Sequence, residues 1–378
     1  MFEIRKFSEL GAEQVLLDPP TRYRRHKPTV AFGPLNKDVR KVLDRFFSAP
    51  EVTVPEQSAF DLRDATIVRS GITMTEDAVV AETLYNLDGA KSFFGFERDG
   101  AMLTRVDTVK DRKAGDYVNL MVPTESVYGH WLFELIPKIE AAIRLGYSDR
   151  KFIISWRTPM KEQLDIILRA YGINPETQLV RGFDHPTLYE RVAFMPHRNH
   201  YPYWKSPKVT EVLEDLGRRL SPKPRKRRRR LFVTREDASD RQIQNIAEIE
   251  SLLAARGFEK VTSASLPFNE QVSTFQEAEI VVGVIGSALS NIVFCKRGTP
   301  IVFLSTEHMA GTWFYEICSQ KGHPYSVVSG TAAAADGVAT YRQNFCLKPG
   351  EVGAAIDAVE PLPAWLRWLP SRQFEATR

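Results

Sequence analysis

The chain lacks the sequence features of membrane-spanning, secreted and disulfide-stabilised proteins. None of its 378 residues falls in an uncharged apolar run of about 18 or more, the length that a spanning helix needs. The N-terminal segment 1–9 has no hydrophobic stretch long enough for a secretory signal. The three cysteines are widely spaced, which argues against a disulfide framework and for a reducing compartment. We therefore expect a cytoplasmic protein, either free or peripheral at the inner membrane.

The common motifs for metals and cofactors are also absent from the sequence. No spacing of Cys, His and Asp residues is typical of a metal site, and Asp61-Leu-Arg-Asp64 does not form an Asp-x-Asp triplet. The segment Gly283-Val-Ile-Gly286 lacks the spacing of the dinucleotide fingerprint, and no Gly-Lys-Ser/Thr follows it as in a P-loop. We therefore expect metal-independent chemistry and no resident cofactor.

Positive charge is concentrated in one short run, Lys223-Pro-Arg-Lys-Arg-Arg-Arg-Arg230. The net charge is +4 and this run holds seven cationic residues, which leaves −3 for the rest of the chain. Nucleic-acid-binding proteins usually spread their basic charge over a face, so no nucleic-acid partner is expected. Two interpretations stay open: a solvated linker, or contact of Arg225–Arg230 with an anionic membrane surface.

Hydrophobic periodicity divides the chain into four parts. Residues 1–125 hold short apolar runs broken by Gly and Asp, which predicts a β-rich N-terminal region. Residues 126–222 alternate strands with helices and predict an α/β lobe. Residues 223–350 hold five predicted strands with four helices between them, the pattern of a doubly wound, Rossmann-like sheet. Residues 351–378 are predicted to be a C-terminal tail.

His130 and Glu134 form the first candidate catalytic pair. They are four residues apart in a helix predicted over 126–145, so they share one face of it. A carboxylate beside an imidazole orients it, raises its basicity or itself acts as a base. Pro137 lacks an N–H, leaves the carbonyl of Phe133 without its helical partner, and predicts a kink or an early end. The alternative is that His130 is a structural residue in a packed helix.

Two arginines and a glycine turn form a candidate anion site. Arg235 follows a predicted strand, and Arg241 lies in the first turn of a helix predicted over 240–256, where a cation favours an anionic partner. The turn Gly286-Ser287-Ala288 connects a predicted strand to a helix over 288–295, so its backbone N–H groups are suited to a phosphate. The alternative for both arginines is a surface ion pair with a neighbouring carboxylate such as Asp240.

A loop rich in His and aromatic residues follows the predicted strand 191–195. Its sequence is Pro196-His-Arg-Asn-His-Tyr-Pro-Tyr-Trp204, and aromatic faces stack well on sugar rings. The loop is therefore a candidate lining for a saccharide. A packed connection between a strand and a helix is the alternative.

Four segments together resemble glycosyltransferase family 61. Tyr128-Gly-His-Trp-Leu-Phe-Glu-Leu-Ile-Pro-Lys138 resembles the family's Tyr-x-His-Trp-Leu-x-Glu-x-x-Pro-Arg signature, and Arg235 with Arg241, Asn245 and Glu248 resembles its Arg-rich segment. The helix over 269–278 resembles its Glu-Gln…Phe…Ala helix, and Gly283–Phe294 resembles its Gly-x-His-Gly-Ala-Gly-Leu-x-Asn-x-x-Phe turn. The likeness covers about residues 50–330. Ile285 and Ile246 stand where many members have His and Glu.

The resemblance implies an α/β, GT-B-like fold, in which two Rossmann-like lobes face a cleft and the acceptor lobe is 126–222. It implies an inverting glycosyltransferase that moves a sugar from a nucleotide-diphosphate sugar, UDP-linked by expectation, to a saccharide acceptor in surface or capsular polysaccharide synthesis. The implied donor-binding residues are Arg235, Arg241, Asn245, Gly286, Ser287, Ala288 and Asn291, and the implied base is His130 or Glu134. The rival hypothesis, favoured by Ile285, is a degenerate protein that binds a nucleotide or polysaccharide without turnover.

Overall fold

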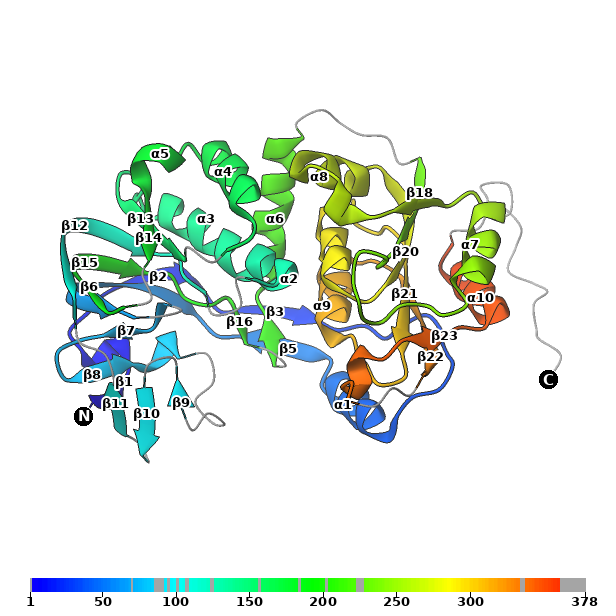
Figure 1. Cartoon of the computed structure of the whole chain (residues 1–378), viewed down its shortest axis with the longest axis horizontal. Helices are drawn as coiled ribbons and strands as arrows, with labels where there is room; N and C mark the ends of the chain where they lie inside the picture. Colours follow the sequence, from blue (N-terminus) through cyan, green and yellow to red (C-terminus); the bar gives the residue numbers. More distant parts are fainter. Residues whose placement is uncertain are drawn as a thin grey trace.

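The structure is a computed structural model, in which two large β-sheets are separated and flanked by helices (Figure 1). It describes residues 2–68, 71–84, 92–93, 96–99, 102–105, 109–122, 126–155, 158–182, 185–200, 203–221, 228–333 and 337–360. No helix of these residues is long and apolar enough to cross a membrane.

The first sheet is mixed and joins the predicted β-rich region to the predicted first lobe. Twelve described strands form it, in the order β14-β13-β12-β15-β6-β7-β8-β1-β11-β10-β9, with β2 also paired to β6. The strands are β1 (Phe2–Arg5), β2 (Glu13–Asp18), β6 (Gln57–Ile67), β7 (Thr73–Met74), β8 (Ala78–Val80), β9 (Ser92–Phe93), β10 (Phe96–Asp99), β11 (Met102–Arg105), β12 (Asp111–Asn119), β13 (Lys151–Ser155), β14 (Leu179–Gly182) and β15 (Thr187–Phe194). The four neighbouring strands β14, β13, β12 and β15 form its longest uninterrupted parallel run among the described residues. The expectation of two separate Rossmann-like lobes was therefore too simple.

The second sheet is the predicted doubly wound one. Its order is β19-β18-β20-β21-β22, all parallel, with β23 antiparallel and β4 parallel to β22. The strands are β4 (Ala31–Phe32), β18 (Arg229–Val233), β19 (Glu259–Val261), β20 (Ala278–Val284), β21 (Ile301–Thr306), β22 (Tyr325–Ala332) and β23 (Phe345–Cys346). Two-stranded ribbons pair β3 (Thr21–Arg24) with β5 (Glu51–Val54), and β16 (Asn199–His200) with β17 (Trp204–Lys205).

Helices cover both faces of the second sheet (Figure 1). The helices α7 (Ile246–Ala255) and α10 (Pro349–Val359) pack on one face in a common apolar core, so α10 crosses the predicted start of the tail at residue 351. On the other face lie α8 (Phe268–Gln276), α9 (Thr312–Lys321) and the 3₁₀ helix η6 (Ser287–Phe294). The first lobe contributes α4 (Lys161–Ala170), α5 (Pro175–Gln178) and α6 (Pro207–Leu220).

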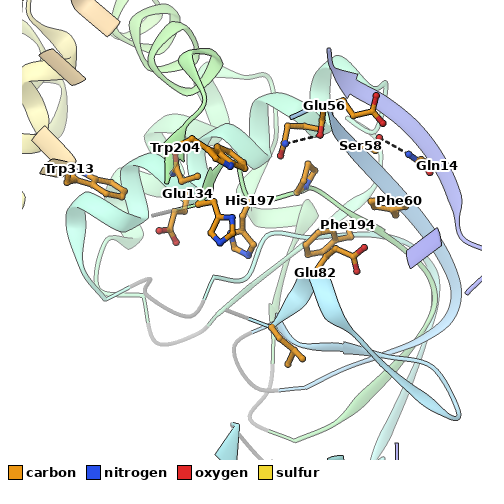
Figure 2. A pocket seen from close by; sticks show the side chains of 15 residues that line it. Gln14, Glu56, Ser58, Phe60, Glu82, Glu134, Phe194, His197, Trp204 and Trp313 are labelled. Carbon is orange, nitrogen blue, oxygen red and sulfur yellow. Dashed lines mark hydrogen bonds between the residues drawn. The ribbon is translucent and has the colours of Figure 1, made fainter. Parts of the chain in front are cut away.

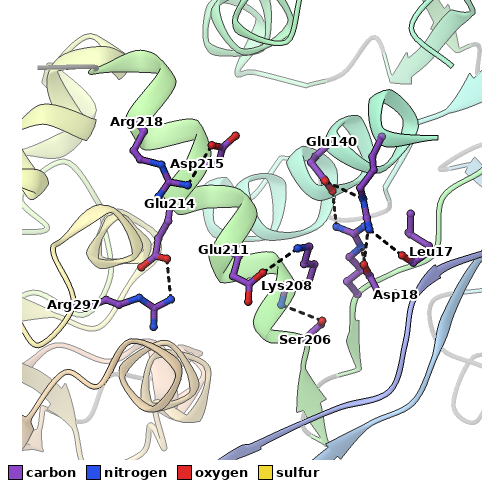
Figure 3. A network of polar contacts seen from close by, with 12 residues as sticks. Leu17, Asp18, Glu140, Ser206, Lys208, Glu211, Glu214, Asp215, Arg218 and Arg297 are labelled. Atoms are coloured by element: carbon purple, nitrogen blue, oxygen red, sulfur yellow. Dashed lines mark hydrogen bonds and ion pairs between the residues drawn. The ribbon is translucent and has the colours of Figure 1, made fainter. Parts of the chain in front are cut away.

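One continuous hydrophobic core connects the two sheets. The same cluster contains Val118 and Phe152 of the first sheet and Val281 and Phe303 of the second. At this interface Glu214 of α6 is paired with Arg297 at 2.8 Å (Figure 3). It is also paired with the buried Lys321 at 2.8 Å. Because apolar burial stabilises in proportion to area, a shared core holds the lobes in a fixed relation.

The N-terminal segment passes from one lobe to the other. Strand β4 pairs with β22 of the second sheet, and helix α1 (Lys37–Ser48) follows it there before β5 and β6 return to the first lobe. A buried ion pair at 2.5 Å between Arg25 and Glu316 of α9 fastens this segment. The second lobe therefore includes residues from the predicted N-terminal region.

The predicted helix 126–145 forms with an extra residue in one turn. It consists of α2 (Tyr128–His130), a π-helical turn (Trp131–Leu135) and α3 (Ile136–Arg144). Pro137 has no N–H for the carbonyl of Phe133, and that carbonyl instead accepts a hydrogen bond of 3.1 Å from Nδ2 of Asn199. The helix does not end early at Pro137 but continues to Arg144, and its irregularity is the π-helical turn that precedes the proline.

Candidate functional site

The second sheet brings the predicted anion-binding residues together at its topological switch point. The chain leaves β18 toward β19 on one side, and β20 lies on the other side, so a crevice opens at the carboxyl ends of β18 and β20. Arg235 follows β18 and Gly286 follows β20. A cavity of about 220 Å³ lies there, lined by residues that include Thr234, Arg235, Glu236 and Arg241.

Arg235 lies directly against the backbone of Gly286. A Cβ on Gly286 would lie 1.9 Å from Nη1 of Arg235, so only glycine admits the guanidinium at this position. Ser287 and Ala288 follow as the first residues of η6, and both are partly exposed. The predicted meeting of Arg235 with the glycine turn is therefore present in the structure.

Arg241 reaches the same turn, but the predicted helix over 240–256 was wrong at its start. Helix α7 begins only at Ile246, and Arg241 is a loop residue with a left-handed backbone, φ 55°. Its N–H donates to the carbonyl of Arg342 at 3.1 Å, and its Nη1 donates to the carbonyl of Ile285 at 3.3 Å. A non-glycine residue in this conformation is strained, and such strain is often found at functional sites.

The alternative ion-pair interpretation also holds for these arginines. Asp240 is 2.6 Å from Nη2 of Arg235 and 3.8 Å from Nη2 of Arg241. The carboxylate is largely shielded from solvent, and burial alone would raise its pKa, yet Arg342, Arg241 and Arg235 together lower it. Asp240 therefore keeps its charge and orients the guanidinium groups around it.

Two predicted donor-binding asparagines are engaged by the protein itself. Asn245 precedes α7, where its Nδ2 donates to the carbonyl of Leu347 at 2.8 Å and its Oδ1 accepts from the N–H of Leu347 at 3.0 Å. Asn291 is fully buried; its Oδ1 accepts from the Tyr128 hydroxyl at 2.6 Å and its Nδ2 donates to Gln271 at 3.0 Å. Asn245 therefore holds backbone groups and Asn291 links two side chains, and contact with a donor stays a prediction for both.

His130 and Glu134 are paired as expected. Nδ1 of His130 is 2.7 Å from Oε1 of Glu134 across the π-helical turn. Glu134 is 5% exposed and His130 is 31% exposed, so the carboxylate is shielded while the ring reaches solvent. The ring centroid of His130 lies 5.1 Å from that of Trp313 on α9, which places the pair at the junction of the lobes.

Two buried lysines, Lys138 and Lys205, act electrostatically on Glu134, and neither was predicted as a site residue. Lys138 donates to the carbonyl of Met121 at 3.2 Å, and burial lowers its pKa to about 7 against the opposing effect of Glu134. Nζ of Lys205 lies 3.4 Å from the centroid of the Trp313 ring, and burial lowers its pKa to about 7, opposed by Glu316 and Glu134.

A cavity of about 710 Å³ opens beside Glu134 (Figure 2). Strand β2, strand β6, the 3₁₀ turn η3 (Ala81–Thr83) and the predicted His/aromatic loop all contribute to its wall. The lining residues are Gln14, Glu56, Gln57, Ser58, Phe60, Glu82, Leu84, Glu134, Phe194, Pro196, His197, Asn199, His200, Trp204 and Trp313. Within that loop Tyr203 is exposed away from the cavity lining, and Tyr201 lies outside the described residues.

The segment 309–313 connects the two candidate sites. Nη1 of Arg241 lies 3.3 Å from the sulfur of Met309, and Gly311 lies against the side chain of Ile285. Two residues later, Trp313 contacts His130 and lines the large cavity. The arginine cluster and the His130–Glu134 pair therefore border opposite ends of one short loop.

Two arginines of the basic run belong to the fold. Arg229 and Arg230 begin β18. Arg229 pairs with Glu259 at 2.5 Å, and Arg230 pairs with Glu360 and lies over the ring of Phe258 at 4.5 Å. Of the predicted membrane-contacting segment Arg225–Arg230, residues 225–227 lie outside the described residues.

Comparison with known proteins supports the family resemblance. The family model described as Glycosyltransferase 61 matches residues 128–302. No curated protein matches the chain. Among solved structures, the dodecameric iron-containing heptosyltransferase TibC in complex with ADP-D-beta-D-heptose is 13% identical, with 80% of this chain and 93% of that chain covered and a TM-score of 0.35.

The bacterial iron-containing dodecameric glycosyltransferase TibC from enterotoxigenic E. coli H10407 is 14% identical over the same shares of both chains, with a TM-score of 0.36. Structural similarity at these TM-scores does not identify site residues. The family match does bear on the site, because its span contains the His130–Glu134 pair, both predicted arginines and the Gly286 turn. Residues 128–302 therefore match the family model of glycosyltransferase family 61, the family that the sequence motifs resemble.

Proposed function

We propose that the protein is an inverting, nucleotide-sugar-dependent glycosyltransferase in which, as in GT-B-like enzymes, one lobe binds the donor and the other binds the acceptor. The observation that carries this proposal is the joint placement of Arg235, Arg241 and Gly286 at the switch point of a doubly wound sheet. In this assignment residues 223–350 bind the donor and residues 126–222 contribute the acceptor site. By family resemblance, the product belongs to a surface or capsular polysaccharide made on the cytoplasmic side of the membrane.

The proposed reaction is a single displacement at the anomeric carbon. The acceptor hydroxyl oxygen attacks C1 of the sugar, the bond from C1 to the phosphate oxygen breaks, and its electron pair leaves with the nucleoside diphosphate. The hydroxyl proton passes to the base. Arg235, Arg241 and the N–H groups at Ser287 and Ala288 stabilise the charge on the departing diphosphate without a metal ion.

We propose His130 as the base and Glu134 as the residue that orients it. Because Nδ1 faces the carboxylate at 2.7 Å, a proton there leaves Nε2 free to accept one from the acceptor. Glu134 is only 5% exposed whereas His130 is 31% exposed, so the imidazole is the more accessible of the two to an acceptor hydroxyl. The pair thus resembles a carboxylate–imidazole dyad.

We propose that the acceptor is a saccharide without negative charge near the reacting hydroxyl. The large cavity beside Glu134 is lined by three glutamates and by the rings of Phe60, Phe194, Trp204 and Trp313, and its described lining contains no Lys or Arg. Aromatic rings stack on sugar faces, and carboxylates accept bonds from hydroxyl or amino groups. Phosphate or carboxylate groups on the acceptor would face like charge.

The decisive experiment compares two histidines that each sit beside a carboxylate. His130→Ala should lower kcat at least about a hundredfold, as removal of a general base does. His185→Ala is the matched control, because His185 is 29% exposed and lies 3.3 Å from Asp111. Turnover near the parent level in a folded His130→Ala protein would remove His130 from the mechanism, and Glu134→Gln then tests the remaining candidate.

Donor binding is tested separately by calorimetry with UDP. Arg235→Ala should weaken UDP binding about ten- to a hundredfold, because a charge-assisted hydrogen bond contributes about 1.5–3 kcal/mol. Arg219→Ala, on the exposed surface of α6, serves as the control. Equal affinity of parent and Arg235→Ala for UDP would refute the assignment.

The second candidate function is binding without turnover. It is favoured by Ile285, which is fully buried, and by Asp240, which already occupies the guanidinium of Arg235. Hydrolysis of a nucleotide sugar in the absence of acceptor separates the two, because a pure binding protein releases no free sugar.

We propose an anionic membrane surface as a further partner of the basic run. Each Lys or Arg near such a surface contributes about 1 kcal/mol. Replacing Arg225 and Arg227 by Gln should therefore weaken binding to phosphatidylserine vesicles in a flotation assay. Since Arg229 and Arg230 are paired in β18, their replacement should lower stability instead.

A further inference from the structure

A third arginine joins the donor-side cluster from a distant part of the chain. Asp240 accepts hydrogen bonds from Nη2 of Arg235 at 2.6 Å and from Nε of Arg342 at 2.9 Å, on its two different oxygens. Arg241 is 3.8 Å from the first of these oxygens. Arg342 lies beyond residues 128–302, so neither the family match nor the sequence motifs include it.

The backbone around Arg342 is held firmly against the Arg241 loop. Arg342 ends the 3₁₀ turn η7 (Thr340–Arg342), and its carbonyl accepts from the N–H of Arg241 at 3.1 Å. Two residues on, Oδ1 of Asn344 accepts from the N–H of Gln242 at 2.9 Å. The position of Arg342 is therefore fixed by the same contacts that hold Arg241 in its strained conformation.

The charge of this cluster matches a diphosphate. Three guanidinium groups face one carboxylate, which leaves two positive charges. Glu236, which lines the cavity, is paired at 2.9 Å with Lys260, and Lys260 also pairs with Glu250 at 2.9 Å. A nucleoside diphosphate or pyrophosphate brings at least two negative charges to the site.

Two observations at Arg241 point to an acceptor that the protein does not supply. Its Nε is buried and has no hydrogen-bond partner. Burial first, and then repulsion from Arg235 and Arg342, lowers the pKa of this guanidinium against the opposing effect of Asp240. A buried donor without an acceptor costs about 1–3 kcal/mol, so a bound oxyanion would stabilise the cluster.

We propose that Arg342 is a third diphosphate-binding residue and that Asp240 is the internal counter-ion that holds all three arginines ready for the donor. In the free protein Arg342 is 57% exposed, and its side chain can reach the outer phosphate oxygens while Arg235 and Arg241 bind from the Gly286 side. This inference rests on the proposed donor site and extends it to residues 340–342.

The test is calorimetry with inorganic pyrophosphate and with UDP on the full chain. Arg342→Gln should weaken binding of both ligands at least about tenfold, because it removes one charged hydrogen-bond donor. Arg342→Lys should recover part of the loss. Arg112→Gln is the matched control, since Arg112 is also exposed and also pairs with one carboxylate, Asp64, at 2.9 Å. Unchanged affinity of a folded Arg342→Gln protein for both ligands would overturn the inference.

Failure of this inference can be told apart from failure of the proposed function. If Arg235→Ala weakens pyrophosphate binding and Arg342→Gln does not, the donor site stands and the role of Arg342 falls. If the parent protein binds neither ligand, both fall. The salt dependence gives a second readout, because the slope of log affinity against log salt should decrease in Arg342→Gln and not in Arg112→Gln.

Discussion

The two halves of the candidate site have opposite chemistry. On the side of the first sheet, the large cavity presents Glu56, Glu82 and Glu134 among aromatic rings. On the side of the second sheet, three arginines surround Asp240 at the carboxyl ends of two parallel strands. The loop 309–313 touches both halves.

This difference suggests how one protein holds two substrates of unlike charge. The positive potential at the second sheet attracts a dianionic leaving group, and the carboxylates of the large cavity repel it. Stacking surfaces with hydroxyl-binding carboxylates suit a neutral sugar instead. The predictions below test whether the two halves are separable, in order of decreasing expected effect.

The largest effect is expected from Gly286→Ala. The new Cβ would lie 1.9 Å from Nη1 of Arg235, which forces the guanidinium out of the turn and blocks the adjacent N–H groups. UDP affinity measured by calorimetry should fall about a hundredfold, since two charge-assisted contacts are disturbed. Gly350→Ala is the control, because no atom lies within 4 Å of its added Cβ. Retained UDP affinity would show that donor binding does not use this turn.

A smaller effect is expected from breaking the hydrogen bond between the halves. Tyr128→Phe leaves Oδ1 of the fully buried Asn291 without its 2.6 Å donor. The free energy of unfolding should fall by about 2 kcal/mol, the usual cost of an unsatisfied buried acceptor. Urea denaturation measures this, with the exposed Tyr341→Phe as control. A stability equal to the parent would mean that the contact does not link the lobes energetically.

The buried amine of Lys205 gives a pH-dependent prediction. Its pKa is about 7 in the folded protein and 10.5 in an unperturbed lysine, so between these values only the unfolded chain holds the proton. Stability should therefore rise with pH over this interval, by about 1.4 kcal/mol per unit from this group.

Lys205→Met should remove that contribution from the slope measured by urea unfolding at pH 7, 8 and 9. Lys208 lies three residues further on, in helix α6, and its side chain is more exposed. Lys208→Met should therefore leave the slope unchanged. If the Lys205→Met slope equals that of the parent, the amine stays protonated in the folded state.

The smallest effect is expected from Lys260→Gln. This change releases Glu236, at 2.9 Å from Lys260, as an uncompensated negative charge at the donor cavity. UDP should bind two- to fivefold more weakly, because exposed pairs contribute about 0.2–1 kcal/mol. Lys41→Gln, whose exposed partner is Asp38, is the control. Tighter UDP binding would contradict the proposed charge balance.

The second lobe could be predicted in outline from local sequence, because each of its parallel strands is a short apolar run followed by a helical pattern. The start of α7 shows the limit of that reasoning. Ile243 keeps helical spacing with Ile246 and Ile249 and is buried in the same core. It is not in the helix, however, but forms an isolated β-bridge with Phe345. The backbone of residues 241–245 is satisfied by residues 342–347, a partner that periodicity does not reveal.

The first lobe was predictable only in its helices and parallel strands. Its sheet pairs β1 with β8 and β11, and β6 with β15, contacts over long separations that turn signals do not specify. The crossing of β4 and α1 to the second lobe is of the same kind. In the site, the His130–Glu134 pair followed from helical spacing and the pairing of Asp240 with the arginines from sequence proximity, whereas Arg342 and Lys205 depend on tertiary placement.

The π-helical turn before Pro137 has one more consequence. Residues before it and at its start face the second lobe: Tyr128 bonds Asn291, and the ring of Trp131, the first residue of the turn, lies 6.2 Å from that of Phe268. Residues after it face the first lobe, where Lys138 bonds Met121. One inserted residue rotates a helix by about 100°, so a single continuous rod can present different faces to two partners in succession. Deleting one residue from this turn would bring the two faces back into phase and separate the imidazole from its carboxylate.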